Sequence, residues 1–335
     1  MTKQELFDTL RTGGKMPHTL FTPILMHFAA RHIGHTYGEF ASDYKVLVEA
    51  NLKALEDFDV DMLWLISDPY RETAAFGAGI EYQAEGVPKC LNHVINNTDD
   101  IDKLKLPDIY NSPRTLDRIR GADALSKETK GTIPIIGWIE GPLAEACDLA
   151  GVTEMMVMLM MDPDASNTLM DTCLEMGKLF AKAQVETGCS IIGMGDAVCS
   201  QIDKDTYDAF VLERHKEIIS FIHGIGGLVK LHICGNITHL LPSIKKVGAD
   251  IIDLDWQVDF DHAYEILGDD VVLCGNINPV DIQDLTEDDV YKLSEKLVDT
   301  YKNRKFILSG GCEITVNTPA KNLLAMRRAS KKDKD

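Results

Sequence analysis

The segment Gly-Leu-Val-Lys-Leu-His-Ile-Cys-Gly-Asn at residues 227–236 joins an apolar run to a polar end. Residues 228–233 have the length and composition of a strand buried inside a sheet. His232 and Cys234 are two positions apart, so in an extended chain their side chains point to the same face. The segment therefore predicts a buried strand that ends with an imidazole and a thiol side by side.

A second apolar run, at residues 306–308, ends in Ser-Gly-Gly-Cys312. Imidazole and thiolate groups are ligands that suit zinc in proteins. We therefore predict that His232, Cys234 and Cys312 bind a zinc ion. Three protein ligands leave one position of a tetrahedral ion open, which is typical of a catalytic zinc site and not of a structural one.

Cys274 is an alternative third ligand, because it also lies towards the end of a predicted strand. Two glycines, Gly310 and Gly311, come before Cys312 and allow the backbone to turn its side chain into a site. The sequence therefore favours Cys312 and leaves Cys274 open.

Eight apolar runs with strand character alternate with stretches of helical spacing. This alternation predicts a single-domain (β/α)8 barrel, with an open doubly wound sheet as the alternative. The eight runs are residues 20–26, 60–66, 132–139, 190–195, 228–233, 250–256, 271–276 and 306–309.

Three segments are expected to lie outside the barrel repeat. Residues 1–18 are predicted to form a helical extension at the N-terminus. The glycine-rich and acidic stretch at residues 74–112 is typical of a long insertion or lid and not of a second domain. The tail at residues 327–335 is charged and is expected to fray.

In a (β/α)8 barrel the active site lies at the C-terminal ends of the strands, so polar residues there are candidates for the site. Besides the three metal ligands, these candidates are His27, Arg31, Asp68, Glu140, Asp196, Asn236, Asp255 and Asn276. Glu140 and Asp196 are assigned a catalytic role, in orienting the acceptor or the metal ligands, although hydrogen bonding at the barrel rim explains them equally well. Asn236 and Asn276 are equally suited to anchoring loops.

The overall composition limits the possible partners. The 335 residues include 34 basic and 53 acidic side chains, which gives a formal net charge of −19. This charge argues against nucleic acid or an anionic membrane as a partner. The first residues lack the pattern of a signal peptide and no apolar run is long enough to span a bilayer, so we expect a cytoplasmic enzyme. The eight cysteines are too sparse for a disulfide scaffold and are expected to be reduced.

Four segments resemble the uroporphyrinogen decarboxylase superfamily, and more narrowly its cobamide-dependent methyltransferase branch, the methylcobamide:coenzyme M methyltransferases and their relatives. The resemblance covers most of the chain and is strongest from about residue 190 onwards. The segments are residues 231–236 (Leu-His-Ile-Cys-Gly-Asn), 247–253 (Val-Gly-Ala-Asp-Ile-Ile-Asp), 274–279 (Cys-Gly-Asn-Ile-Asn-Pro) and 310–319 (Gly-Gly-Cys-Glu-Ile-Thr-Val-Asn-Thr-Pro).

This resemblance implies a (β/α)8 barrel and a zinc ion at the positions that match His232, Cys234 and Cys312. It also implies that a methyl group moves from methylcobamide, carried by a partner corrinoid protein, to a small-molecule thiol activated on the zinc. The thiol is coenzyme M, homocysteine or another acceptor. In this interpretation the remaining candidates bind the cofactor and substrate: His27, Arg31, Asp68, Asn236, Asp255 and Asn276.

Two other functions stay open. The decarboxylase branch of the superfamily has an Arg-x3-Arg pair after the first strand that binds substrate carboxylates, and it needs no metal. Here the matching residues are His27 and Arg31, so only the second arginine is present. A loss of one cation weakens the case for a polyanionic tetrapyrrole substrate. The third possibility is a barrel that binds a corrinoid or a small molecule without catalysis.

Overall fold

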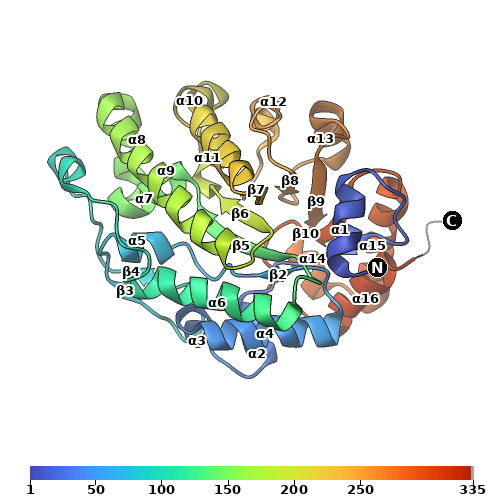
Figure 1. The fold of residues 1–335 in the computed structure, drawn as a ribbon. Coiled ribbons are helices and arrows are strands. Elements are labelled where there is room, and N and C mark those ends of the chain that lie inside the picture. The colour runs from blue at the N-terminus through green and yellow to red at the C-terminus, as the bar shows by residue number, and fades with distance from the viewer. Residues whose placement is uncertain (333–335) are drawn as a thin grey trace.

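The computed structural model describes residues 1–332, and its centre is one sheet of eight parallel strands (Figure 1). Their order in the sheet is β1-β10-β9-β8-β7-β6-β5-β2. The strands are β1 (Leu20–Phe21), β2 (Leu63–Trp64), β5 (Ile135–Glu140), β6 (Ile191–Gly195), β7 (Leu228–Ile233), β8 (Ile251–Leu254), β9 (Val272–Ile277) and β10 (Phe306–Gly310). Each lies within or overlaps one of the eight predicted runs, which confirms the (β/α)8 barrel.

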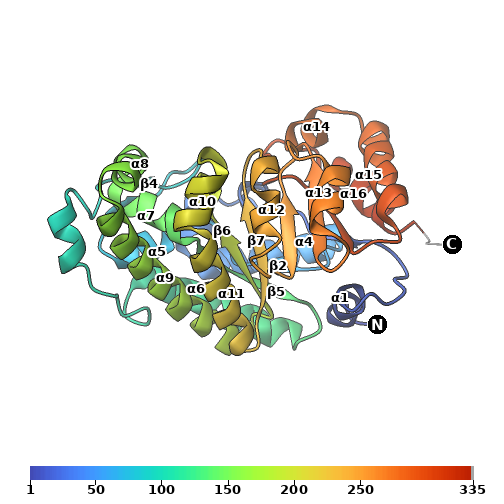
Figure 2. The ribbon, with the colours of Figure 1, turned by 90° about the horizontal axis from the view of Figure 1, so that it is seen from above.

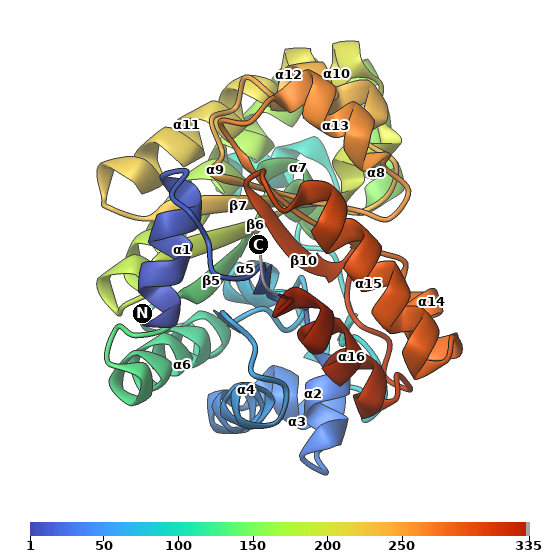
Figure 3. The same cartoon turned by 90° about the vertical axis from the view of Figure 1, so that its right-hand side faces the viewer.

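The helices surround the strands, as Figure 3 shows for α4, α6, α11, α15 and α16. The α-helices are α1 (Lys3–Arg11), α2 (His27–His32), α3 (Tyr37–Ser42), α4 (Tyr44–Phe58), α5 (Arg71–Ala75), α6 (Pro113–Thr129), α7 (Pro142–Ala150), α8 (Val152–Met161), α9 (Pro163–Glu186), α10 (Lys204–Phe210), α11 (Leu212–Gly224), α12 (Leu241–Ile244), α13 (Phe260–Leu267), α14 (Pro279–Asp284), α15 (Glu287–Tyr301) and α16 (Ala320–Ser330). Within residues 1–332 no helix combines the length and the apolar character needed to cross a bilayer.

The predicted insertion is a largely irregular segment at one side of the barrel. It contains a short hairpin, β3 (Ile80–Glu81) with β4 (Lys89–Cys90), and the 3-10 helix η1 (Thr98–Lys103). Figures 1 and 2 show the part around residue 100 projecting at the edge of the molecule. Two further 3-10 helices, η2 (Ala197–Gln201) and η3 (Thr238–Leu240), follow β6 and β7.

The N-terminal extension covers one end of the barrel. The buried face of α1, with Leu6, Phe7 and Leu10, belongs to the same apolar cluster as inward residues near the beginnings of the strands, such as Ile136 and Ile307. Helix α1 therefore closes the N-terminal end of the barrel, and the opposite end, where the strands finish, remains for the site.

The seam between β1 and β2 is closed by one residue, Asp61, through its backbone and its side chain, and not by a ladder of strand hydrogen bonds. The Asp61 backbone N–H donates to Phe21 O at 2.8 Å, and the Phe21 N–H donates to the Asp61 carboxylate at 2.8 Å. Asp61 also forms ion pairs with Arg327 at 2.8 Å and with Lys3 at 2.9 Å. The first helix, through Lys3, and the last helix, through Arg327, are thereby bound to this seam.

The expectation that the chain frays from Arg327 onwards is wrong for the described part of the tail. Helix α16 continues to Ser330, and Arg327 is only 6% exposed. The two buried or half-buried carboxylates of Asp61 and Asp59 hold the Arg327 guanidinium, which explains why a charged residue stays ordered here. The last three residues of the predicted tail lie outside the described part of the chain.

Candidate metal centre

The three predicted zinc ligands converge at the C-terminal end of the barrel. His232 is the fifth residue of β7, Cys234 follows the end of that strand, and Cys312 lies two residues beyond β10. The His232 Nε2 atom is 3.0 Å from Cys234 Sγ and 4.0 Å from Cys312 Sγ, and the two sulfur atoms are 3.7 Å apart. These three residues form one group with the donor spacing of a metal site.

The separation of the two sulfur atoms fits a tetrahedral zinc ion. With zinc–sulfur bonds of about 2.3 Å, two sulfur ligands of such an ion are about 3.8 Å apart, close to the observed separation of Cys234 and Cys312. Hydrogen bonding with Cys234, together with His232, lowers the pKa of the Cys312 thiol, although burial opposes the change. The same contact, together with burial, raises the pKa of the Cys234 thiol, so Cys312 is the sulfur of the pair that more readily loses its proton.

Glycine backbones place both cysteines. Gly235 has a φ of +91°, which turns the chain directly after Cys234 and strains any residue with a side chain. The Gly311 N–H donates to Ile277 O at 2.8 Å, and a Cβ at Gly311 would lie 2.8 Å from the Cα of Trp256. The loop that carries Cys312 can approach the β8 end this closely only because residue 311 is glycine.

A buried ion-pair chain lies behind the imidazole. His232 Nδ1 is 3.4 Å from Asp253 Oδ2, which is 3.2 Å from Lys230 Nζ. Burial by itself raises the pKa of Asp253, but Lys230 and His232 outweigh this effect and keep the pKa below its usual value. Asp253 is therefore a carboxylate that can orient the His232 ring, with Nε2 towards the cysteines.

Cys274, the alternative ligand, is placed elsewhere. Its sulfur accepts a hydrogen bond from Lys230 Nζ at 3.0 Å inside the barrel, and the residue is fully buried. Burial raises the pKa of its thiol to about 12. The structure therefore groups Cys312, and not Cys274, with the other two ligands.

A cavity of about 180 Å³ opens beside the three ligands. Three carboxyl residues line it, namely Asp68, Glu140 and Glu313. Its apolar wall includes Ile24, Met26, Ile66, Val87 and Trp138. A small molecule in this cavity thus contacts the donor group at one end and hydrocarbon or carboxyl groups along its length.

The three carboxyl groups differ in how they are held. Asp68 is fully engaged, by Arg114, by the Ser67 hydroxyl at 2.7 Å and by the Tyr70 N–H at 3.0 Å. Burial by itself raises the pKa of Asp68, but the arginine outweighs it and lowers the pKa. Asp68 is therefore an ionised part of the wall whose lone pairs are already used.

Glu140 and Glu313 use only one carboxyl oxygen each. Glu140 Oε1 accepts from Arg71 at 2.7 Å and from the Trp138 indole at 3.0 Å. Glu313 Oε1 accepts from the His27 backbone N–H at 2.9 Å. Burial raises the pKa of Glu140 to about 8, with Arg71 opposing, and burial raises that of Glu313 to about 7.

Asp196, assigned a catalytic role from the sequence, is buried away from this cavity. Its carboxylate accepts from the Ala144 N–H at 2.8 Å, at the start of α7, and lies 3.0 Å from His215 Nε2. Together with His215 and Cys199 it forms a second group of metal-type donors. Since its oxygens are used by backbone and imidazole, Asp196 fits the alternative of hydrogen bonding that positions a helix.

His27 and Arg31 lie on α2 and not in the predicted strand-end loop. The His27 ring stacks on Tyr37 with centroids 4.9 Å apart, and its Nε2 is 2.9 Å from Glu85. Arg31 is exposed and donates to Asn317 at 3.0 Å. Neither residue lines the cavity, although the His27 backbone holds Glu313.

The remaining candidates fix loops around the ligands. Asp255 accepts from the Gly235 N–H at 2.9 Å and so holds the turn after Cys234. Asn276 donates to Asp255 O at 3.1 Å and to Val258 O at 2.7 Å. The exposed Asn236 accepts from the Thr238 N–H at 3.0 Å. All three make the loop-anchoring contacts that the sequence had left as an alternative.

Reasoning from the sequence missed several residues of this site. Glu313 follows Cys312 directly within the quoted Gly-Gly-Cys-Glu segment, so its adjacency was a usable signal. Asp253 also lies in a quoted segment, two residues before Asp255. Tyr37, which lines the cavity and donates to Ser67 O, carries no signal that separates it from other tyrosines.

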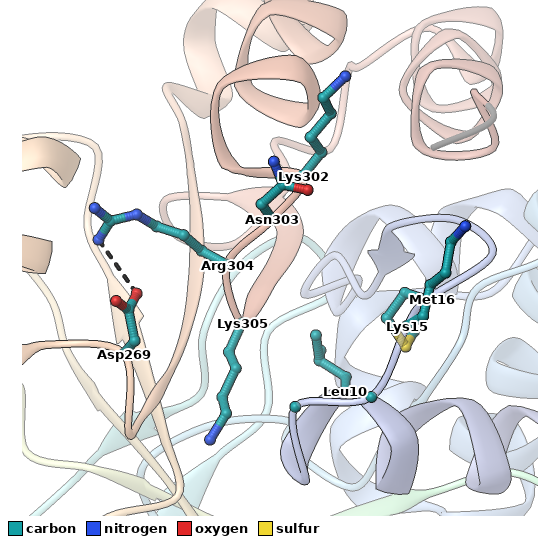
Figure 4. A pocket seen from close by; sticks show the side chains of 10 residues that line it. Leu10, Lys15, Met16, Asp269, Lys302, Asn303, Arg304 and Lys305 are labelled. Atoms are coloured by element: carbon teal, nitrogen blue, oxygen red, sulfur yellow. Dashed lines mark hydrogen bonds and ion pairs between the residues drawn. The ribbon is translucent and has the colours of Figure 1, made fainter. Parts of the chain in front are cut away.

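A larger cavity of about 490 Å³ lies at the opposite end, beside α1 and the segments before β9 and β10. Several basic side chains line it, but Arg304 is paired with Asp269 at 3.3 Å. Figure 4 shows the amino groups of Lys302 and Lys305 pointing in different directions and not towards a common point. This arrangement does not form a second candidate site.

The family model described as uroporphyrinogen decarboxylase (URO-D) matches residues 2–332. A methylcobamide:CoM methyltransferase, MtbA, of Methanosarcina acetivorans is 30% identical over 264 residues, which are 78% of this chain and 76% of that protein. A uroporphyrinogen decarboxylase of Carboxydothermus hydrogenoformans is 24% identical over 333 residues, 94% of this chain and 93% of that protein. A solved methyltransferase from Methanosarcina mazei superimposes with a TM-score of 0.88, at 20% identity and 98% coverage of both chains.

Proposed function

This chain belongs to the uroporphyrinogen decarboxylase family, and on that premise we propose that it is a zinc-dependent methyltransferase. It moves a methyl group from a methyl-corrinoid protein to a small-molecule thiol. The observation that carries this proposal is the convergence of His232, Cys234 and Cys312 beside a small cavity at the barrel mouth. The relatives named methylcobamide:CoM methyltransferases support the same class of reaction.

Each residue of the centre has a definite task. His232, Cys234 and Cys312 hold the metal, and Asp253 keeps the imidazole oriented. When bound, zinc would supply a Lewis acid that lowers the pKa of the acceptor thiol. The apolar wall of the cavity excludes water from the acceptor sulfur. In the overall transfer a sulfur–carbon bond forms, the cobalt–carbon bond breaks, and the thiol proton is released.

The decarboxylase alternative has less support from the same cavity. A porphyrinogen substrate carries several carboxylates and needs cations to bind them. None of the described residues that line the mouth cavity is lysine or arginine, whereas three are acidic. Arg31, the one arginine kept from the expected pair, is held by Asn317 outside this lining.

The test compares three cysteine variants of the full chain. We expect purified wild-type protein to contain one zinc per chain by elemental analysis and to methylate a thiol from methylcobalamin. Cys234→Ser and Cys312→Ser each remove a ligand, so zinc content and methyl transfer fall together. Cys274→Ser is the matched control, because that thiol contacts Lys230 and not the metal group, and it retains zinc.

Three outcomes contradict the proposal. Full zinc occupancy in both Cys234→Ser and Cys312→Ser shows that the metal lies elsewhere. Decarboxylation of uroporphyrinogen that is insensitive to chelators assigns the chain to the decarboxylase branch. Binding of a corrinoid without turnover on any thiol indicates a binding barrel.

A further inference from the structure

The mouth cavity presents two carboxyl oxygens that have no partner. Glu140 Oε1 and Glu313 Oε1 are engaged by protein donors, whereas Oε2 of each residue has no hydrogen bond within residues 1–332. Both residues line the cavity. Oε2 of Glu140 lies 3.4 Å from the Cβ that a side chain at Gly195 would have, and Gly195 is itself part of the lining. A ligand in the cavity thus meets two carboxyl oxygens that no protein donor occupies.

Free donors are missing from the same lining. Among the described residues around the cavity there is no lysine or arginine, and the Tyr37 hydroxyl already donates to Ser67 O. Arg71 pairs with Glu140 and Arg114 pairs with Asp68, and neither arginine lines the cavity. A sulfonate or carboxylate has acceptor atoms only, so the side chains of this lining offer it a hydrogen bond only from a carboxyl group that keeps its proton, and they place it beside the ionised Asp68. An ammonium group, with three N–H donors, can donate to these oxygens, and its charge favours the ionised form of each carboxyl group.

The size of the cavity restricts the length of the acceptor. Its volume of about 180 Å³ is below the range of about 300–1,000 Å³ typical of sites for drug-sized ligands. Glu313 follows the ligand Cys312 directly, so a carboxyl group lies near the position where a thiol would meet the metal. A short thiol with a polar end only a few atoms from the sulfur is the ligand that matches.

We propose that the acceptor of this enzyme is a short thiol that carries an ammonium group, which Glu140 and Glu313 bind. This inference rests on the proposed function and sets the chain apart from the relatives that are named as coenzyme M methyltransferases. Glu140 and Glu313 determine specificity by accepting hydrogen bonds from the ammonium group, and the three metal ligands receive the sulfur.

The test uses three thiols with the same two-carbon spacer: 2-aminoethanethiol, 2-mercaptoethanol and 2-mercaptoethanesulfonate. Each is titrated into protein whose zinc has been replaced by Co²⁺, and binding is followed by the change in the cobalt absorption spectrum. We expect the dissociation constant to be at least about tenfold lower for the ammonium thiol than for the sulfonate, with the hydroxyl thiol between them.

Variants assign the preference to the two carboxyl groups. In Glu313→Gln we expect the ratio between the sulfonate and ammonium dissociation constants to fall several-fold, while binding of the neutral thiol changes little. Glu140→Gln is the second variant, and its loss of the pair with Arg71 is checked by far-ultraviolet circular dichroism. Glu85→Gln is the matched control, because Glu85 is exposed near His27 and does not line the cavity. We expect this variant to keep the wild-type order of the three dissociation constants.

The results separate this inference from the proposed function. If the sulfonate thiol binds as tightly as the ammonium thiol or more tightly, the inference is overturned while the thiol methyltransferase stands. An ammonium preference that persists in both Glu313→Gln and Glu140→Gln also overturns it. If no thiol changes the cobalt spectrum, the proposed function itself fails.

Discussion

At the scale of single residues, the centre depends on a charge chain buried inside the barrel. Lys230 and Asp253 are at most 1% exposed, and Lys230 Nζ also lies 5.0 Å from the Trp64 ring centroid. Burial by itself lowers the pKa of Lys230, but Asp253 outweighs it and raises the pKa, so both partners are ionised. A buried lysine therefore stabilises the carboxylate that orients the His232 ring.

This arrangement predicts the effect of Asp253→Asn. The amide cannot supply the negative charge that fixes the His232 ring, so zinc affinity falls by about 10–100-fold. The measurement is competition for zinc with a calibrated chelator, on variant protein shown to be folded. Asp250→Asn is the control, because Asp250 contacts His223 and the Val229 N–H at the beginning of β7, away from the metal ligands, and should leave zinc affinity unchanged. Equal affinity in Asp253→Asn and wild type would show that Asp253 has no role in orienting the ligand.

At the scale of elements, the centre depends on how closely the loop after β10 approaches the end of β8. Register in the sheet pairs Ser309 with Asn276 and Gly310 with Ile277, so Cys312 lies just beyond the strand ends. Cys274 is paired with Ile307 on the same ladder, deeper in the barrel. Cys312 therefore lies nearer the barrel mouth than Cys274, and this difference in position along the strands decides which cysteine lies beside His232 and Cys234.

The close approach at Gly311 predicts the effect of Gly311→Ala. The added methyl group collides with the backbone of Trp256, which must move and displace Cys312. We expect the free energy of unfolding to fall by about 1–3 kcal/mol and zinc occupancy to fall with it. Denaturant unfolding and elemental analysis measure the two effects.

Gly224→Ala is the control for this prediction. Gly224 ends α11, and nothing lies within 4 Å of a Cβ at this position. Its substitution should change stability by less than about 1 kcal/mol and leave zinc unchanged. If Gly311→Ala behaves like Gly224→Ala, the backbone approach to Trp256 is not what positions Cys312.

At the scale of the whole molecule, the barrel is closed by side chains that are far apart in the chain. Asp61 joins β1 to the segment before β2, and Arg327 on the last helix binds both Asp61 and Asp59. Lys3 on α1 reaches the same two carboxylates, at 2.7 and 2.9 Å. The first and last helices are thereby fixed to the only seam of the described sheet that lacks a strand ladder.

Arg327→Met tests the importance of this seam. The change leaves the buried Asp61 carboxylate with Lys3 as its remaining cation, and we expect the free energy of unfolding to fall by about 3 kcal/mol. Its neighbour provides the control, because Arg328 forms an exposed pair with Glu287, and Arg328→Met should cost less than about 1 kcal/mol. Equal stability losses in the two variants would rule out a special role for Arg327 at the seam.

The local pattern of residues was sufficient to predict the eight strands and the convergence of His232, Cys234 and Cys312 at the barrel mouth. Strand period places His232 and Cys234 on one face, and parallel strands bring their ends to one mouth, so both conclusions follow from short-range geometry. The same reasoning failed at Arg327, where a charged sequence suggested a frayed tail. The carboxylates that hold Arg327 come from positions almost 270 residues earlier, and no local pattern contains them.

The amino-acid sequence by itself therefore determined the barrel class, the direction in which its strands finish, and the set of donors at that end. Only the tertiary structure decided between Cys312 and Cys274, placed Asp253 and Lys230 behind the imidazole, and left one oxygen of Glu140 and of Glu313 free in the cavity. The reason is that strand register and barrel closure set how far along the barrel axis residues on different strands lie. These positions along the axis depend on packing across the whole molecule.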